Sequence, residues 1–143
     1  MSVGLLLITH GDIGAALLTT ARRMFGVCPL AADAMAVRDE ADAEQLRNDA
    51  LRRVEALNCG DGVLVLTDMY GSTPANIAAS LQCLPGVRAL AGVNLPMLVR
   101  VFNYPALGVD DLMDKALGGG SEGVMRCCRP DTLADLVGEA GER

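Results

Sequence analysis

Short, mainly apolar runs alternate along this chain with segments whose apolar residues recur at helical spacing. The apolar runs lie at residues 3–8, 31–37, 63–67 and 87–93. Runs of this length are typical of strands in a parallel sheet that is covered on both faces. Because a helical segment follows each run, the pattern predicts an α/β fold. We expect a doubly wound, mostly parallel sheet of about four strands plus an edge strand, with helices on both faces.

The segments between the strands predict the helices. Pro74 and Pro96 suit the first turn of two of them. The glycines at 118–120 are expected to end the last helix, and residues 122–128 are expected to form the edge strand. The predicted helices span residues 12–25, 39–57, 75–83, 97–102 and 107–117.

The composition is that of a folded, acidic domain. The 143 residues are 51% hydrophobic and 21% charged, and the net charge is −6. A chain of this length is long enough to bury a core of its own. We therefore expect one domain over residues 1–128, followed by a tail over 129–143. No cluster of four or more basic residues occurs, which argues against nucleic acid as a partner.

Membrane and cofactor motifs are absent from the sequence. The apolar runs are too short to span a bilayer, and no basic segment precedes the first of them as in a signal peptide. We therefore expect a cytoplasmic protein with no direct membrane insertion. The five cysteines and the single histidine lack the paired spacing of a zinc site, and there is neither a P-loop nor a dinucleotide-binding glycine motif. We expect no metal and no cofactor.

Polar residues follow three of the predicted strands, at the ends where open α/β sheets bind their ligands. His10, the only histidine, follows the first strand, and Asp68 and Asn94 follow two others. A carboxylate that accepts a hydrogen bond from one imidazole nitrogen leaves the other nitrogen free as a nucleophile. His10 and Asp68 are therefore the candidate catalytic pair, although each taken alone also fits an ordinary loop or capping role.

Residues near this pair suit an anion. Gly11 permits the close approach of a bulky group. Gly71, Ser72 and Thr73 lead into a predicted helix, whose first free N–H groups favour negative charge. Ser72 and Thr73 are also ordinary residues for a helix start. Nucleophile, carboxylate and anion site together predict phosphoryl transfer through a phosphohistidine.

Thr67 and Asn94 are expected to lie around the catalytic pair and to support its position. A histidine phosphatase has a similar histidine after its first strand, but it needs an arginine in place of Thr9 and a second histidine. The sequence has neither.

Three motifs lie in order along the chain: Thr9-His10-Gly11, the run from Leu66 to Pro74, and the run from Ala91 to Leu98. Together they resemble the enzyme IIA component of the mannose family of the bacterial phosphoenolpyruvate-dependent sugar phosphotransferase system. The resemblance covers nearly the whole chain. It implies that His10 accepts a phosphoryl group from phospho-HPr and passes it to a IIB component, with support from Asp68.

The resemblance also implies a loop, an assembly and an alternative role. The loop 71–73 would line the phosphoryl site, and the protein would be a homodimer in which the last strand is exchanged. Asp12 departs from the family, because some members carry an aromatic residue there, and a carboxylate so close to a phosphohistidine would repel the phosphoryl group or make it more labile. Since no IIB domain is fused before Arg143, the acceptor is expected to be a separate protein. The alternative is a stand-alone regulatory module whose His10 phosphorylation state controls a partner protein.

Overall fold

Four parallel strands form one sheet in the part of the chain that the structure describes, residues 2–129 and 131–134 of a computed structural model. The strand order is β2-β1-β3-β4, and every neighbouring pair is parallel. This confirms the predicted parallel sheet. The strands are β1 (Gly4–His10), β2 (Ala32–Val37), β3 (Val63–Thr67) and β4 (Val87–Ala91).

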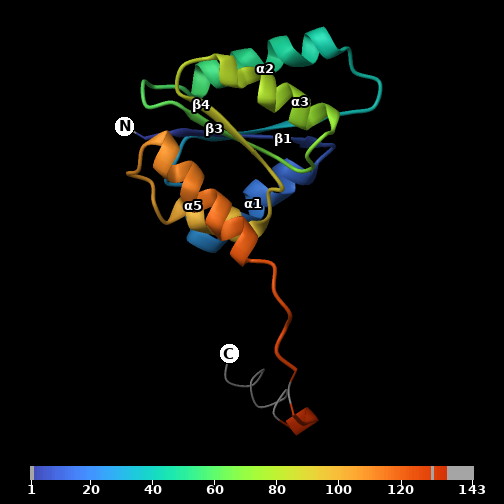
Figure 1. Cartoon of the computed structure of the whole chain (residues 1–143), viewed down its shortest axis with the longest axis vertical. Helices are drawn as coiled ribbons and strands as arrows, with labels where there is room; N and C mark the ends of the chain where they lie inside the picture. Colours follow the sequence, from blue (N-terminus) through green and yellow to red (C-terminus); the bar gives the residue numbers. More distant parts are fainter. Residues whose placement is uncertain (1, 130, 135–143) are drawn as a thin grey trace.

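Helices cover both faces of the sheet. In Figure 1, α2 and α3 lie on one face, and α1 and α5 lie on the other. The contacts of α4 with α5 and α1 place it on the second face. The doubly wound α/β prediction is therefore confirmed. The helices are α1 (Ile13–Phe25), α2 (Ala43–Leu57), α3 (Thr73–Ser80), the short 3-10 helix η1 (Leu81–Cys83), α4 (Leu95–Phe102) and α5 (Val109–Glu122).

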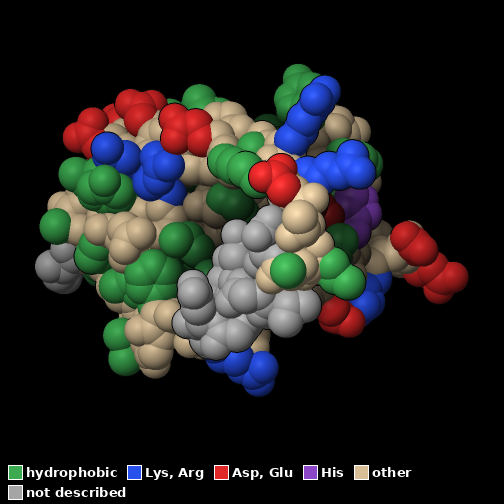
Figure 2. All heavy atoms as spheres, turned by 90° about the horizontal axis from the view of Figure 1, so that it is seen from below, with side chains coloured by type: hydrophobic (Ala, Val, Ile, Leu, Met, Phe, Trp, Pro, Cys, Tyr) green, Lys and Arg blue, Asp and Glu red, His purple; other side chains and the backbone are tan. Residues whose placement is uncertain are grey.

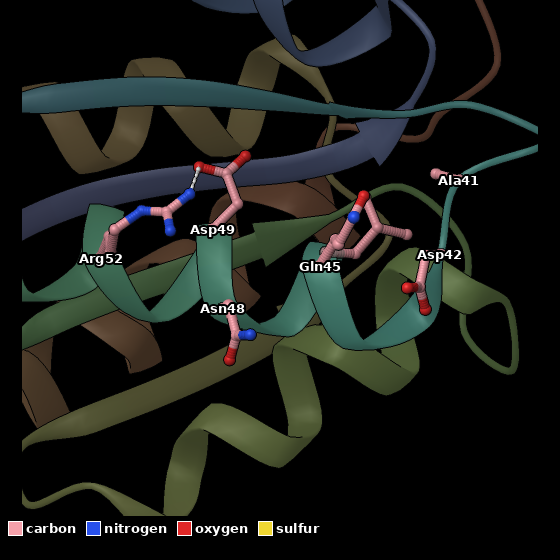
Figure 3. A pocket seen from close by; sticks show the side chains of 7 residues that line it. Ala41, Asp42, Gln45, Asn48, Asp49 and Arg52 are labelled. Carbon is pink, nitrogen blue, oxygen red and sulfur yellow. Dashed lines mark ion pairs between the residues drawn. The ribbon is translucent and has the colours of Figure 1, made fainter.

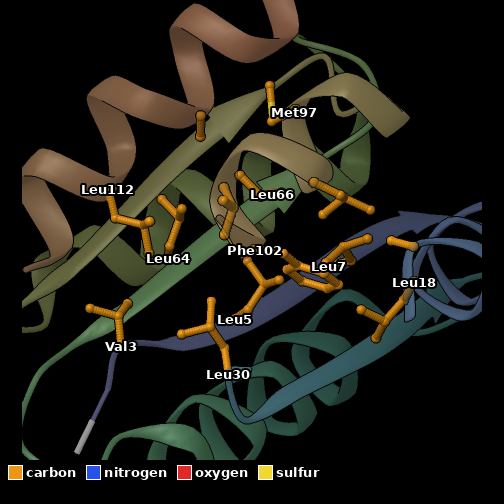
Figure 4. Packing of buried hydrophobic residues seen from close by; sticks show 14 residues of the cluster. Val3, Leu5, Leu7, Leu18, Leu30, Leu64, Leu66, Met97, Phe102 and Leu112 are labelled. Atoms are coloured by element: carbon orange, nitrogen blue, oxygen red, sulfur yellow. The ribbon is translucent and has the colours of Figure 1, made fainter. Parts of the chain in front are cut away.

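The central strand β1 is buried on both faces. Leu5 and Leu7 pack into the core under α1, α4 and α5, whereas Leu6 and Ile8 pack into the core under α2 and α3. All four side chains are fully buried, and burial of such a side chain contributes roughly 1.5–3 kcal/mol. Figure 4 shows the first of these cores between the sheet and its helices. Because β1 is held from both sides, the residue at its carboxyl end has a fixed position.

The register of the sheet brings three strand ends together. Ile8 on β1 pairs with Thr67 on β3, and His10 pairs with Val37 on β2. The residues that follow β2 and β3 therefore flank His10 from opposite sides. From β1 the chain first adds β2 on one side and then β3 on the other. Doubly wound sheets place their ligand sites where the direction of strand addition reverses in this way.

The predicted end of the last helix is wrong. Helix α5 continues through the three glycines to Glu122. A Cβ at Gly119 would lie 2.5 Å from the Cβ of Arg100, and one at Gly120 would lie 2.7 Å from the Cε of Met97. The glycines therefore allow α5 to approach α4 closely, and this packing outweighs their poor intrinsic helix propensity.

The predicted edge strand over residues 122–128 is also wrong. Glu122 ends α5, and residues 123–128 form neither helix nor strand. The chain leaves the body of the domain here (Figure 1), so this segment does not reach a strand with which it could pair, and β4 remains at the edge of the sheet. Of the predicted tail, positions 130 and 135–143 lie outside the described residues.

The helices of the described residues include none with the length and apolar character that a membrane span requires.

Candidate functional site

The imidazole of His10 is fixed by one carboxylate. The Nδ1 atom of His10 lies 2.8 Å from Oδ2 of Asp68, and the backbone N–H of His10 donates to the same oxygen at 3.1 Å. An ionised carboxylate only accepts hydrogen bonds, so Nδ1 carries the hydrogen and Nε2 keeps its lone pair. The Asp68 side chain is 12% exposed and that of His10 is 44% exposed. Figure 2 shows the histidine, in purple, at the molecular surface.

The surroundings of Asp68 favour its ionised form. Burial on its own would raise the pKa of the Asp68 carboxyl group, but hydrogen bonds from the His10 ring and from backbone N–H groups outweigh burial. The pKa of Asp68 is therefore lower than its ordinary value. The second oxygen, Oδ1, accepts from the N–H of Met69 at 3.1 Å. The site thus holds a carboxylate that remains charged near neutral pH.

The main chain on both sides of His10 is also fixed. The Oγ1 atom of buried Thr9 accepts from the N–H of Gly14 at 2.7 Å, and the N–H of Gly11 donates to the carbonyl of Val37 at 2.9 Å. A Cβ at Gly14 would lie 2.9 Å from Thr9 Oγ1. The sequence reasoning missed this contact between strand and helix. A glycine in the first turn of a helix, shortly after a strand with threonine as its second-last residue, is the signal that indicates it.

A cavity of about 290 Å³ opens beside the imidazole. Its wall includes His10, Arg38, Asp39 and Thr73. Thr73 is the first residue of α3, and the first N–H groups of a helix have no partner within the helix. Among the predicted anion-binding residues, Thr73 therefore lines the same cavity as His10. Gly11 adjoins His10 with a φ of +47°, a conformation that favours glycine.

Two members of the predicted anion loop have other surroundings. Ser72 precedes α3, and its hydroxyl group donates to the carbonyl of Met69 at 2.6 Å. Gly71 has a φ of +81° and lines a separate cavity of about 260 Å³, together with Thr67 and Tyr70. These residues shape the turn between β3 and α3, but they do not line the cavity that His10 lines.

The two predicted supporting residues do not hydrogen-bond to His10 in the described part of the chain. Thr67 is buried at the end of β3, and its hydroxyl oxygen has no hydrogen-bond partner among the described residues. The side chain of Asn94 joins two helices: it accepts from the N–H of Met97 at 2.9 Å and donates to the carbonyl of Gly120 at 3.1 Å. Asn94 thus begins α4 and ties it to α5.

Arg38 is a neighbour of the site that the sequence reasoning missed. Its Nη2 atom lies 2.7 Å from Oδ1 of Asp12, the residue that precedes α1. Its Nη1 atom lies 3.9 Å from the place that a Cβ on Gly11 would occupy. Because Arg38 follows β2 directly, the rule that ligands bind beyond strand ends indicates it when the rule is applied to β2 as well as to the other three strands.

A larger hollow adjoins the cavity that His10 lines, with Ala41 and Leu46 in the walls of both. It has a volume of about 470 Å³ and follows one side of α2, where Arg52 and Asp49 form an ion pair of 3.6 Å (Figure 3). The surrounding side chains are mostly exposed, and neither His10 nor Asp68 lines it. Its polar groups are those of a solvated helix face, so we do not regard it as a catalytic site. Elsewhere, too, the described residues include no group of three or more His, Cys, Asp or Glu side chains that could hold a metal ion.

Comparisons with known proteins all find components of the phosphotransferase system (PTS). Residues 4–117 match the family model EIIA-man, described as the PTS system fructose IIA component. The chain is 31% identical over 129 residues to the PTS system mannose-specific EIIAB component of Escherichia coli K12. That alignment covers 87% of this chain and 39% of the relative, so this chain spans well under half the length of the curated relatives that it matches.

Solved structures show the same fold. The mannose/sorbose-specific IIA subunit of the phosphotransferase system from Enterococcus faecalis has a TM-score of 0.81 and 25% identity, with 93% of this chain and 100% of that chain covered. The phosphotransferase system component EIIA from Streptococcus agalactiae has a TM-score of 0.74 and 24% identity, with 88% and 97% covered.

Proposed function

Because this chain belongs to the EIIA-man family of phosphotransferase system IIA components, we propose that it is a phosphoryl carrier of sugar uptake. His10 accepts a phosphoryl group from phospho-HPr and passes it to a IIB component. The observation that carries this proposal is the 2.8 Å contact between Nδ1 of His10 and Asp68, which leaves Nε2 as the nucleophile. Family membership itself confirms the resemblance indicated by the three sequence motifs.

The proposed transfer is a displacement at phosphorus. The lone pair of His10 Nε2 attacks the phosphorus atom, the P–N bond to the donor histidine breaks, and its electron pair returns to the donor ring. The proton on Nδ1 stays in its hydrogen bond with Asp68, whose negative charge offsets the positive charge on the phosphorylated ring. Transfer to the IIB component repeats the same step with His10 as the leaving group.

The proposed phosphoryl-binding residues are Gly11, Gly71, Ser72 and Thr73. Thr73 stands at the start of α3 and in the His10 cavity, so its N–H and the helix dipole suit an incoming anion. Gly11 has no side chain that would obstruct the phosphoryl group. Gly71 and Ser72 form the turn that places the start of α3 at this point.

Exposed apolar side chains beside the site support docking of protein partners. Met69 is 59% exposed and Tyr70 is 88% exposed, and both follow Asp68 directly. Ile13, at the start of α1, is 48% exposed. Apolar and aromatic side chains of this kind are enriched at protein interfaces. We propose that HPr and the IIB component contact this surface in turn, and that the relay operates in the cytoplasm.

The edge of the sheet supports the proposed homodimer. Among the described residues β4 has one strand neighbour, β3, and on its other edge the N–H of Ala89 donates to Oε1 of Gln82 at 3.0 Å. The segment 123–128 leaves the domain without pairing, and Val124 and Met125 on it are largely exposed. We propose that this segment from a second copy pairs with β4 and takes the place of the Gln82 side chain at Ala89, since an edge strand can accept a further strand. In this proposal the folded domain ends near residue 128.

Phosphorylation with purified components tests the function. The protein is incubated with phosphoenolpyruvate, enzyme I and HPr, and intact mass is followed for the wild type, His10→Ala and His10→Gln. We expect the wild type to gain the mass of one phosphoryl group and both variants to gain none. Absence of a mass increase in the wild type, or labelling of both variants, would contradict the proposal.

The regulatory alternative is tested with a charge mimic. If the phosphorylation state of His10 controls a stable partner, then His10→Asp and His10→Ala should retain different proteins in pull-down experiments, because only the first carries a negative charge at this position. A carrier that makes only transient contacts should show no such difference.

A further inference from the structure

His10 has a strand end on each side, and the two ends carry opposite charges. Asp68 follows β3 and holds the imidazole through Nδ1. Arg38 follows β2 directly after Val37, the residue that pairs with His10 in the sheet. His10 and Arg38 line the same cavity, so a group bound to His10 within that cavity would have Arg38 in the surrounding wall.

The present partner of Arg38 holds it weakly. The ion pair with Asp12 has an N–O distance of 2.7 Å, but the two side chains are 65% and 80% exposed. Exposed pairs of this kind contribute little stability, so the guanidinium group can leave Asp12 at small cost. Beside it, Gly11 has no side chain, and the Nη1 atom of Arg38 is the neighbour that its missing Cβ would meet, at 3.9 Å. No side chain at position 11 therefore separates Arg38 from His10.

A phosphoryl group on His10 would lie among acidic side chains, so a nearby cation such as Arg38 would stabilise it. A phosphoryl group brings close to two negative charges, and the surrounding acids are Asp12, Asp39 and Asp68. Among the described residues that line the cavity, Arg38 is the only Lys or Arg. A guanidinium group also matches the geometry of phosphate oxygens, to which it can donate two parallel hydrogen bonds.

We propose that Arg38 is a phosphoryl-binding residue, whose guanidinium group moves from Asp12 to the phosphoryl oxygens when His10 is phosphorylated. This inference rests on the proposed function and adds no covalent step to it. Asp12 then has a role as well: it keeps Arg38 beside the site while His10 is free. Once it has moved, the positive charge of Arg38 offsets the repulsion that the carboxylate of Asp12 exerts on the phosphohistidine.

The test compares Arg38→Gln with Arg88→Gln as the matched control. Arg88 also pairs with an aspartate, 2.9 Å from Asp110, but it is less exposed than Arg38 and lies near the amino end of β4, opposite Leu64. Each protein is phosphorylated by phospho-HPr and, separately, by phosphoramidate. With phosphoramidate the bond from phosphorus to Nε2 forms, the N–P bond of the donor breaks, and ammonia leaves with the bonding electron pair.

We expect Arg38→Gln to be phosphorylated about tenfold more slowly than the wild type with both donors, because charge-assisted hydrogen bonds are lost. Arg38→Lys, which keeps the charge but not the paired geometry, should lie between the two, and Arg88→Gln should match the wild type. A second readout is the ³¹P chemical shift of the phosphohistidine against pH. Loss of the nearby cation in Arg38→Gln should move the midpoint to higher pH, since Asp12, Asp39 and Asp68 remain.

The outcomes separate the two proposals. If the wild type is labelled by neither donor, the carrier function is wrong and this inference is wrong with it. If the wild type is labelled, and Arg38→Gln reacts as fast as the wild type with each of the two donors, the carrier function stands and the role of Arg38 is refuted. If only the reaction with phospho-HPr is slower, then Arg38 contacts the donor protein and does not bind the phosphoryl group.

Discussion

Gly4 and Gly62, at the amino end of the sheet, have closer neighbours than Gly71, which follows β3 at the carboxyl end. At the amino end, a Cβ on Gly62 would lie 2.3 Å from the carbonyl oxygen of Gly86, and one on Gly4 would lie 2.6 Å from the carbonyl oxygen of Leu57. At the carboxyl end, a Cβ on Gly71 would meet no atom within 4 Å. The amino-end glycines are therefore required for packing, whereas Gly71 provides a turn and leaves open space.

Arginine shows the same contrast. Arg53, which links α2 to the start of β2, donates to Asp33, to Asp49 and to the carbonyl of Ala34. Burial alone would lower the pKa of the Arg53 guanidinium group, but these bonds and the neighbouring carboxylates raise it. Arg38 has one exposed ion-pair partner among the described residues. One end of the sheet thus holds a cation in place, and the other keeps a cation that can change partners.

The largest expected effect is on the rate of phosphorylation, and it comes from a substitution at the carboxyl end of the sheet. Asp68→Asn should slow phosphorylation by phospho-HPr on the order of 10³-fold, because an amide neither fixes the ring tautomer nor balances the charge of the phosphorylated ring. The fold should remain, since the amide oxygen can still accept from the His10 N–H. Initial rates and circular dichroism measure the two effects. Asp110→Asn, on the Arg88 pair at the other end, is the control, and a similar loss in both variants would refute a special role of Asp68.

The next effect concerns stability at the amino end. Gly62 and Gly71 have similar positive φ angles, +91° and +81°, so alanine strains both backbones by about 1–2 kcal/mol. Only Gly62→Ala adds a steric conflict, and we expect its total loss of unfolding free energy to reach about 3 kcal/mol. Urea denaturation of both variants gives the difference. Equal losses would show that the close approach of Gly62 to Gly86 relaxes without cost.

The smallest effect is the pH dependence that Asp68 contributes. A carboxyl group whose pKa is lowered by folding stabilises the protein at pH values above its unfolded pKa, about 3.9 for aspartate. That stabilisation is lost as the pH falls through the lower pKa of the folded state. The unfolding free energy should therefore decrease more steeply with acid in the wild type than in Asp68→Asn. Parallel curves between about pH 5 and pH 2 would contradict the lowered pKa of Asp68.

Much of the fold could be predicted because it depends on local pattern. The buried run from Val3 to Ile8 and the prolines at the starts of α3 and α4 each indicate one kind of element. The errors arose where distant parts of the chain decide the structure. Gly119 and Gly120 continue a helix because α4 lies against them, and residues 123–128 lack a strand partner.

The site could be predicted only in part, because some of its contacts follow from local pattern and others depend on the order of the strands. The pairing of His10 with Asp68 follows from adjacent strand ends, and the structure places them in contact. The order of the strands cannot be deduced from apolar runs alone. The sequence therefore indicates Asn94, after the far strand β4, and does not single out Arg38, after the neighbouring strand β2.

Three consecutive residues at the end of β1 are anchored by hydrogen bonds: Thr9 to Gly14, His10 to Asp68, and Gly11 to Val37. The proposed acceptor atom thus sits on a rigid support and needs no backbone rearrangement before it reacts. If His10 carries a phosphoryl group as proposed, these bonds would hold the ring in one orientation for the incoming and the outgoing transfer.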